Sequence, residues 1–534
     1  MLTSAASKIA GSLAGSWRSS RTARLAGAAG TALYHILRQS RAARIVTGHR
    51  AGESRTLGLL AGVARRLEKR LGPSPFFARR ALPAAKAGSA AAAVIIAAAA
   101  ALLLPPLYAL AAAAAGVALA AIVFWPEAGL MAGALMLPFV PFKVLCLNAG
   151  LTLASCFLHT KAGSRPARLF VSPLALPAAA LLAVMAAATV TSVLPLASAG
   201  EFLIPVAGVL YAGLMVALFD RREKLENFVF CLVLSAVVAA GYAIYQYYTG
   251  ASALEFKREW VDVTQNTEIK NRAYALFENP NLLAQYACWT ASVSLGALLG
   301  TARRARKIFF GAACVILVMC LGFTFSRGGW LSFLAALAVT AAYTNGRLIL
   351  LPACLLSAWP FLPRAVVQRL STAASLKDSS NAYRLDTWRS TLSLISEHWE
   401  TGVGLGRRAF ARVYQTHAVN SNVVPHSHNL YLQTVSEFGI LGLAVLCWFL
   451  AALFFTGVEL VRSGKPLVRG LNAGIMGALA GFLVHSLVDY FLWYYKLAIL
   501  LWMCAGALAV MQATAADDPS QTAFTGGIKL ERQP

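Results

Sequence analysis

Residues 439–460 read GILGLAVLCWFLAALFFTGVEL and contain a single charged side chain, Glu459. A run of roughly 20 apolar residues is long enough to cross the hydrocarbon core of a bilayer as one helix. The apolar residues follow one another continuously instead of alternating with polar ones, so the run is typical of a helix and not of a strand in a transmembrane barrel. This stretch therefore predicts a membrane-spanning helix.

Similar apolar runs recur along most of the chain after residue 88. Hydrophobic residues make up 58% of the 534 residues and charged residues only 13%, and the mean hydropathy is +0.63. Because soluble domains carry about 25% charged residues, this balance excludes an ordinary soluble protein. We expect an all-α polytopic membrane protein with candidate spans at about 88–104, 107–124, 128–147, 170–194, 202–219, 226–247, 282–300, 308–325, 330–345, 347–362, 439–460, 470–488 and 492–511.

Short loops between these candidate spans indicate the orientation of the chain. Three of them are basic: Asp220-Arg-Arg-Glu-Lys224, Arg303-Arg-Ala-Arg-Lys307 and the stretch with Arg462, Lys465 and Arg469. Since basic loops stay in the cytoplasm, residues 248–281, 326–329 and 363–438 are predicted to share the opposite face of the membrane. If every candidate crossed, the N-terminus would not be cytoplasmic. The break at Pro105-Pro106 indicates that 88–124 crosses once, which gives about 12 transmembrane helices.

The predicted organisation has five parts: a basic cytoplasmic N-terminal extension at 1–87, transmembrane helices at 88–362, a long loop at 363–438 on the face where chemistry is expected, C-terminal transmembrane helices at 439–512 and a cytoplasmic tail at 513–534. The net charge of +25 is concentrated in the extension, whose only acids are Glu53 and Glu68. A basic segment next to a membrane attracts anionic lipids, and this interpretation is favoured over nucleic-acid binding.

The long loop has a pattern of its own. Apolar residues recur in it at helical spacing, at Leu385, Trp388, Leu392, Ile395 and Trp399. This spacing predicts a helix that lies against the membrane or the helix bundle and ends near the glycines of Thr401-Gly-Val-Gly-Leu-Gly406. The nine cysteines all fall in apolar stretches, so neither a disulfide framework nor a cysteine metal site is expected.

The densest group of reactive side chains is Pro425-His-Ser-His-Asn429, directly before the quoted span. His428, Gly439 and Gly442 fall on one helical face, which places a histidine at the mouth of a span. A histidine there can act as a general base toward a hydroxyl group. An interfacial or helix-capping histidine is the alternative.

His428-Asn429, nine residues, and then Gly439-x-x-Gly442 resemble the signature of the O-antigen ligase and polymerase superfamily. Other stretches are similar to that superfamily in the expected order: Arg272-Ala-Tyr-Ala-Leu-Phe-Glu-Asn-Pro-Asn281, with Ala275 where a glycine is often found, Phe325-Ser-Arg-Gly-Gly329, Arg384-Leu-Asp-Thr-Trp388, Gly402-Val-Gly-Leu-Gly406 and finally Asp489. Together they cover roughly residues 90–512, whereas the N-terminal extension lies outside the resemblance.

The resemblance implies a GT-C-like glycosyltransferase of the bacterial inner membrane, with its active site facing the periplasm. Its expected donor is a glycan on undecaprenyl diphosphate and its expected acceptor is a hydroxyl of lipid A–core, the reaction of an O-antigen ligase. Membrane lipids are expected partners, and nucleic acid is not. No cofactor is expected, and because the external loops lack a cluster of acids and histidines with ligand spacing, the site is predicted to be metal-independent.

Each candidate site residue has a predicted role. His428 is the expected base for an inverting displacement, while Arg272 and Arg327 stabilise the departing pyrophosphate, because a guanidinium matches phosphate geometry. Arg384, Asn429 and His426 are assigned to substrate binding, and Gly439 and Gly442 to the structural motif. The two arginines could instead reach toward the membrane interface.

Further alternatives stay open. His426 could replace His428 as the base, Glu437 could orient the histidine or cap a helix, and His485 and Asp489 could form a structural pair four residues apart. An O-antigen polymerase and a protein O-oligosaccharyltransferase would share the fold and the chemistry. A transporter is the rival from another class, and a noncatalytic protein that binds lipid-linked glycans is a third possibility.

Overall fold

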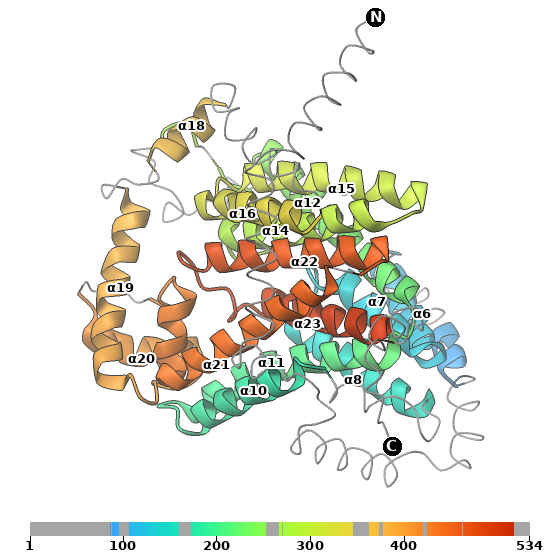
Figure 1. Cartoon of the computed structure of the whole chain (residues 1–534), viewed down its shortest axis with the longest axis horizontal. Coiled ribbons are helices and arrows are strands. Elements are labelled where there is room, and N and C mark those ends of the chain that lie inside the picture. Colours follow the sequence, from blue (N-terminus) through green and yellow to red (C-terminus); the bar gives the residue numbers. More distant parts are fainter. Residues whose placement is uncertain are drawn as a thin grey trace, which may run out of the picture.

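The computed structural model describes residues 86, 88–95, 106–159, 172–251, 266–269, 271–344, 363–372, 378–419, 424–461 and 463–516. The prediction of an all-helical fold is confirmed, since no strand occurs within these ranges. The main helices are α6 (Pro106–Phe124), α7 (Pro126–Met136), α8 (Phe142–His159), α10 (Ala175–Val190), α11 (Pro195–Leu218), α12 (Arg222–Tyr248), α14 (Pro280–Gly300), α15 (Arg304–Phe323), α16 (Arg327–Thr344), α18 (Arg364–Ser371), α19 (Ser379–His398), α20 (Arg407–His417), α21 (Leu430–Leu460), α22 (Pro466–His485) and α23 (Tyr495–Ala516) (Figure 1).

Eight of the described helices are long and apolar enough to cross a membrane: α8, α11, α12, α14, α15, α21, α22 and α23. Helix α10 and residues Ala112–Phe124 of α6 are apolar but shorter. A multi-pass membrane protein is therefore supported, and the count of about 12 spans stays a prediction. The candidate span at 347–362, nearly all of the extension at 1–87 and most of the tail at 513–534 lie outside the described residues.

One predicted span is wrong. The expected helix at 128–147 is divided into α7 and α8, with a turn between Leu137 and Pro141. Pro138 and Pro141 have no backbone N–H to donate, and each ring clashes with the preceding helical turn, so a continuous helix is disfavoured there.

Helix α21 starts nine residues before the predicted span and is interrupted at Gly439, whose φ is +68°. The interruption frees backbone groups, and these bond to the segment that follows α19. Ile440 N donates to Trp399 O at 2.8 Å, and Val403 N donates to Ser436 O at 2.8 Å. A Cβ at position 439 would meet Glu400 O, so only glycine suits both the conformation and the close contact. This interruption attaches the segment that follows α19 to α21.

Helix α22 lies at the centre of the bundle, packed against α14 and α16, while α23 packs against α11 (Figure 1). Small residues let α14 and α22 approach closely. A Cβ at Gly296 would meet Gly470 O and would lie 2.8 Å from Gly474 Cα. Close approach of this kind is how helices gain van der Waals contact in a membrane, where burial from water drives little association.

We predict that Gly296→Ala lowers the thermal stability of the purified protein, because the added methyl group must push two backbones apart. Overpacking of this kind costs about 1–3 kcal/mol. Gly241→Ala is the matched control, because nothing lies within 4 Å of the Cβ position on α12. Melting temperatures in the same detergent measure both, and equal values for the two variants would contradict the packing interpretation.

Candidate functional site

The start of α21 and the connection between α22 and α23 are joined by an imidazole–carboxylate contact. His428 Nδ1 lies 3.1 Å from Asp489 Oδ1. Neighbouring hydrogen bonds hold the same two segments together, since Leu430 N donates to Ser486 O at 2.9 Å and Asn429 Nδ2 donates to Leu487 O at 2.9 Å.

The predicted pair of His485 and Asp489 is wrong: α22 ends at His485, whose Nδ1 lies 2.8 Å from Gln285 Oε1 instead.

Asn429 supports this contact as the N-cap of α21. Its Oδ1 accepts hydrogen bonds from Tyr431 N and Leu432 N, at 2.9 and 3.0 Å. An asparagine at this position satisfies N–H groups that have no partner within the helix. Both ends of the side-chain amide therefore contact the protein backbone, and its predicted role in substrate binding remains untested.

His428 has a backbone conformation that is unusual for a side chain larger than hydrogen. Its φ is +52°, in the left-handed region. Contacts on both sides hold it there: Ser427 N donates to Gln433 Oε1 at 2.6 Å, and Ser427 Oγ donates to Asn429 O at 2.9 Å. Backbone strain of this kind is concentrated at functional sites, where the surrounding structure fixes the side chain in one direction.

The two histidines of the motif differ in their access to solvent. The side chain of His428 is 21% exposed, whereas His426 is buried with its ring stacked on Trp493, with 5.7 Å between the centroids. Burial, followed by the nearby charge of His428, lowers the pKa of His426 well below its usual value. His426 therefore stays neutral, and the geometry favours His428 as the group that meets a substrate.

Glu437 is buried close to this loop, where its carboxylate bonds Gln433 and Tyr490. Its Oε1 accepts from Gln433 Nε2 at 2.8 Å, and its Oε2 accepts from Tyr490 O–H at 3.5 Å. Gln433 in turn holds Ser427. Glu437 thus connects the histidine loop to Tyr490, the residue that follows Asp489. The sequence alone left open whether Glu437 orients the histidine or caps a helix.

Arg272 reaches the same carboxylate through one intermediate. Its NH2 donates to Asn281 Oδ1 at 3.1 Å, and Asn281 Nδ2 donates to Asp489 Oδ2 at 2.9 Å. Burial, and then the charges of Arg369, Arg384 and Arg327, lower the pKa of Arg272 well below its usual value. Because an arginine side chain does not lose its proton in a protein, the lowered pKa indicates that several guanidinium groups share one buried setting.

Arg327 is engaged by the protein itself. Its guanidinium makes two contacts with the buried Asp378, at 3.1 and 3.2 Å, and it also donates to Thr372 O at 2.9 Å and Asn381 Oδ1 at 3.1 Å. Arg369 NH1 lies 3.6 Å from the same carboxylate. Arg327 therefore fastens the segment from α18 to α19 onto α16. The sequence analysis missed Asp378. This residue is the N-cap of α19, and its Oδ1 accepts a hydrogen bond from Ser380 N.

Arg384 is the more available arginine. It lies on α19, next to Tyr383, whose ring packs 5.7 Å from the ring of His428. Its Nε is buried and makes no hydrogen bond to a described residue. Burial lowers its pKa, and the nearby Asp489 partly opposes this. Arg384 thus has a guanidinium nitrogen that is unbonded among the described residues, whereas Arg327, which the sequence analysis assigned to the pyrophosphate, is bonded to Asp378.

His426, His428 and Asp489 could also form a metal site, because their ligand atoms all lie within 4.8 Å of one another. Two imidazoles and a carboxylate are zinc ligands. Two features oppose a divalent cation there: His428 and Asp489 are already hydrogen-bonded, and Arg272 and Arg384 contribute positive charge. The sequence did not indicate this group, because Asp489 lies far along the chain from the loop that holds the two histidines.

Comparison with known proteins supports the superfamily that the motifs resemble. Residues 312–447 match the family model described as O-Antigen ligase, a segment that includes Arg327, Arg384 and His428. No curated protein matches the chain. One solved chain, described as "Structural coordination of polymerization and crosslinking by a peptidoglycan synthase complex", is 18% identical, with a TM-score of 0.37 over 65% of this chain and 98% of the other.

We predict that Asp378→Asn loosens the segment from α18 to α19, because Arg327 and Arg369 lose the carboxylate that balances their charge. Breaking a buried ion pair costs about 3–5 kcal/mol. Amide hydrogen exchange should become faster in peptides from 364–398.

Asp386→Asn is the control, because its partner Arg389 is 69% exposed and surface pairs contribute only about 0–1 kcal/mol. Unchanged exchange in Asp378→Asn would show that Arg327 does not fasten the loop.

Proposed function

We propose that this chain is an O-antigen ligase-type glycosyltransferase of the bacterial inner membrane, with its active site on the periplasmic side. It transfers a glycan from undecaprenyl diphosphate to a hydroxyl group of lipid A–core. The observation that carries the proposal is the accessible His428, paired with the buried Asp489, whose carboxylate is also linked to Arg272 through Asn281. The family match over residues 312–447 supports the same reaction class.

His428 acts as the general base. Asp489 bonds Nδ1, so the proton resides on that nitrogen and Nε2 is left to accept the proton of the acceptor hydroxyl. Burial raises the pKa of Asp489, but the hydrogen bond from His428 and the positive charge of Arg384 hold it well below its usual range. The carboxylate therefore remains ionised and stabilises the imidazolium that forms.

The acceptor oxygen attacks the anomeric carbon as its proton moves to His428. The bond from that carbon to the pyrophosphate oxygen breaks, so one displacement inverts the anomeric centre. Arg384 and Arg272 stabilise the charge that develops on the leaving pyrophosphate, since fixed cations in a buried site favour the transition state. Arg327 acts indirectly: its contact with Asp378 holds α19, which carries Arg384.

A resident metal is not needed in this mechanism, because the base is an imidazole and the leaving group meets guanidinium groups. An O-antigen polymerase or a protein O-oligosaccharyltransferase would use the same groups with a different acceptor.

We predict that His428→Ala lowers the rate of glycan transfer about 10²–10⁴-fold, the usual contribution of a general base. Transfer from lipid-linked O antigen to lipid A–core is measured with purified protein, with and without EDTA. Wild-type activity should be the same in both conditions. Inhibition by EDTA that Zn²⁺ or Mg²⁺ reverses would assign His426, His428 and Asp489 to a metal, and full activity in the variant would remove His428 as the base.

Arg384→Lys should lower kcat with little change in melting temperature, because lysine keeps the charge but cannot present the planar fork that phosphate requires. Arg389→Lys, five residues further along α19 and exposed, is the matched control. An equal fall in kcat for both variants would contradict a role for Arg384 at the leaving group.

A further inference from the structure

A buried carboxylate that no step of the proposed reaction uses lies close to the histidine pair. Glu437 is completely buried in α21, two residues before the interruption at Gly439. Burying a carboxylate is costly unless hydrogen-bond donors surround it. The donors around Glu437 come from three different parts of the chain.

Each of these parts gives one hydrogen bond to the Glu437 side chain. Gln433 Nε2 donates to Oε1 at 2.8 Å, and the hydroxyl of Tyr490 donates to Oε2 at 3.5 Å. The backbone N–H of Gly406 is the third donor. Gln433 lies one turn earlier in α21, Tyr490 lies between α22 and α23, and Gly406 directly precedes α20. Since two carboxylate oxygens offer about four acceptor positions, one side chain can join all three parts.

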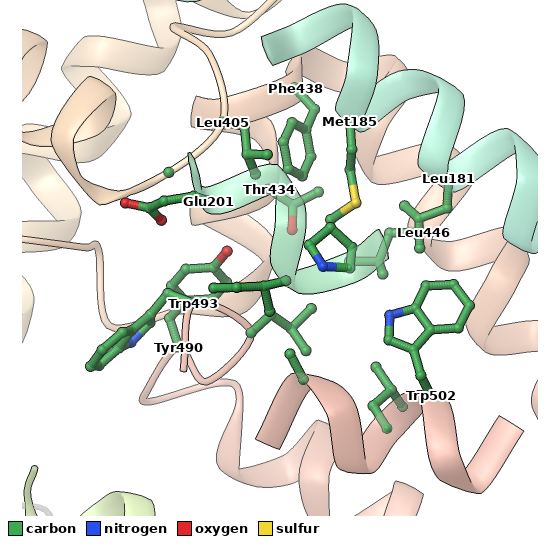
Figure 2. A pocket seen from close by; sticks show the side chains of 16 residues that line it. Leu181, Met185, Glu201, Leu405, Thr434, Phe438, Leu446, Tyr490, Trp493 and Trp502 are labelled. Carbon is green, nitrogen blue, oxygen red and sulfur yellow. The ribbon is translucent and has the colours of Figure 1, made fainter. Parts of the chain in front are cut away.

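The packing around Glu437 is close. Gly404 N donates to Glu437 O at 3.2 Å, and a Cβ added at Gly402 would meet the carbonyl group of Glu437. The side chains that flank this junction line one small cavity: Glu201, Leu405, Thr434, Phe438 and Tyr490 (Figure 2). Because the main chain and the side chain of Glu437 both bond the segment before α20, the carboxylate is fixed in place.

Two hydrogen bonds lead from Glu437 to the histidine loop. Gln433 donates to Glu437, and its Oε1 accepts from Ser427 N at 2.6 Å. The amide of Gln433 cannot turn over without losing both bonds, because its oxygen would then face the carboxylate. Ser427 directly precedes His428, whose backbone is left-handed. Glu437 thus sets the amide orientation that holds Ser427 N, and with it the direction of the His428 side chain.

The bond from Tyr490 leads to the other member of the pair. Tyr490 N donates to Asp489 Oδ1 at 2.9 Å, and the same oxygen lies 3.1 Å from His428 Nδ1. The side chain of Tyr490 bonds Glu437. One buried carboxylate therefore contacts the segment on each side of the imidazole–carboxylate pair.

We propose that Glu437 is a positioning residue for the transfer reaction, which fixes the loop of His428 through Gln433 and the segment of Asp489 through Tyr490. The inference rests on the proposed function, because it concerns the geometry of the base. A misplacement of about 1 Å at a reacting group can cost about 10²-fold in rate. Since Glu437 touches no substrate, its loss should lower kcat and leave the KM values of donor and acceptor unchanged.

A reciprocal exchange tests the bond between the two side chains. Glu437→Gln replaces one acceptor oxygen with an NH2 group, and Gln433→Glu sets a second carboxylate against the first. Each single variant should lower kcat about tenfold or more. The double variant Gln433→Glu/Glu437→Gln should recover most of the lost rate, because the carboxylate then accepts from Ser427 N and from the amide at position 437.

Glu459→Gln is the matched control. Glu459 lies on the same helix, and its Oε2 accepts from Gln512 Nε2 at 3.1 Å, a pair of the same type in an exposed place. Its kcat should equal that of wild type. An unchanged kcat in Glu437→Gln overturns the proposal. A double variant with the melting temperature of wild type that is as slow as the slower single variant overturns it as well.

Two further measurements separate positioning of the base from a general loss of folding. In a His428→Ala background, Glu437→Gln should not lower the remaining rate, because groups that act as a unit are not additive. A further fall overturns the proposal.

Amide hydrogen exchange needs no turnover. It should become faster at Ser427 in Glu437→Gln but not in Glu459→Gln, and unchanged exchange overturns the inference. Faster exchange in a protein whose wild type transfers no glycan keeps the positioning of His428 and overturns the transfer function alone.

Discussion

The arrangement of the site depends on Asp489, a buried carboxylate that bonds groups from three parts of the chain. Oδ1 meets His428 and accepts from Tyr490 N, while Oδ2 accepts from Asn281, which also bonds Arg272. A buried charge is costly unless partners of this kind surround it. The carboxylate therefore brings the imidazole of His428 and the guanidinium of Arg272 into one site, although the residues are distant in the sequence.

The positive charge around this carboxylate explains why the loop needs its own fastening. The charges of Arg369, Arg384 and Arg327 lower the pKa of Arg272 in a buried setting, so these groups would repel Arg272 if the chain were free to move. Asp378 balances part of that charge and closes the loop against α16, and the interruption at Gly439 attaches the segment after α19 to α21. The arginines thus leave positive charge at the place that the proposed reaction gives to the leaving pyrophosphate.

The sequence predicted the helical class, because apolar runs record it directly. The roles of His428, Arg272 and Arg384 came from the family resemblance and stay predictions, although the structure places the three residues around Asp489. The sequence did not predict the contacts between segments that are far apart along the chain. Spacing of four residues predicted a pair of His485 and Asp489, but the helix ends between them and each side chain finds a partner elsewhere. Asp378 belongs to no repeating pattern, and its contact with Arg327 spans 51 residues, so no local signal could have revealed that Arg327 is already engaged.

The central claim is that His428 and Asp489 act as one unit, and a double-mutant cycle tests it most directly. Single-turnover transfer rates would be measured for His428→Ala, Asp489→Asn and the double variant, with folding checked by melting temperature. If the carboxylate works through the imidazole, the double variant should be no slower than His428→Ala alone, because groups that act as a unit are not additive. Losses that multiply would contradict the account, since Asp489 would then contribute to transfer independently of His428.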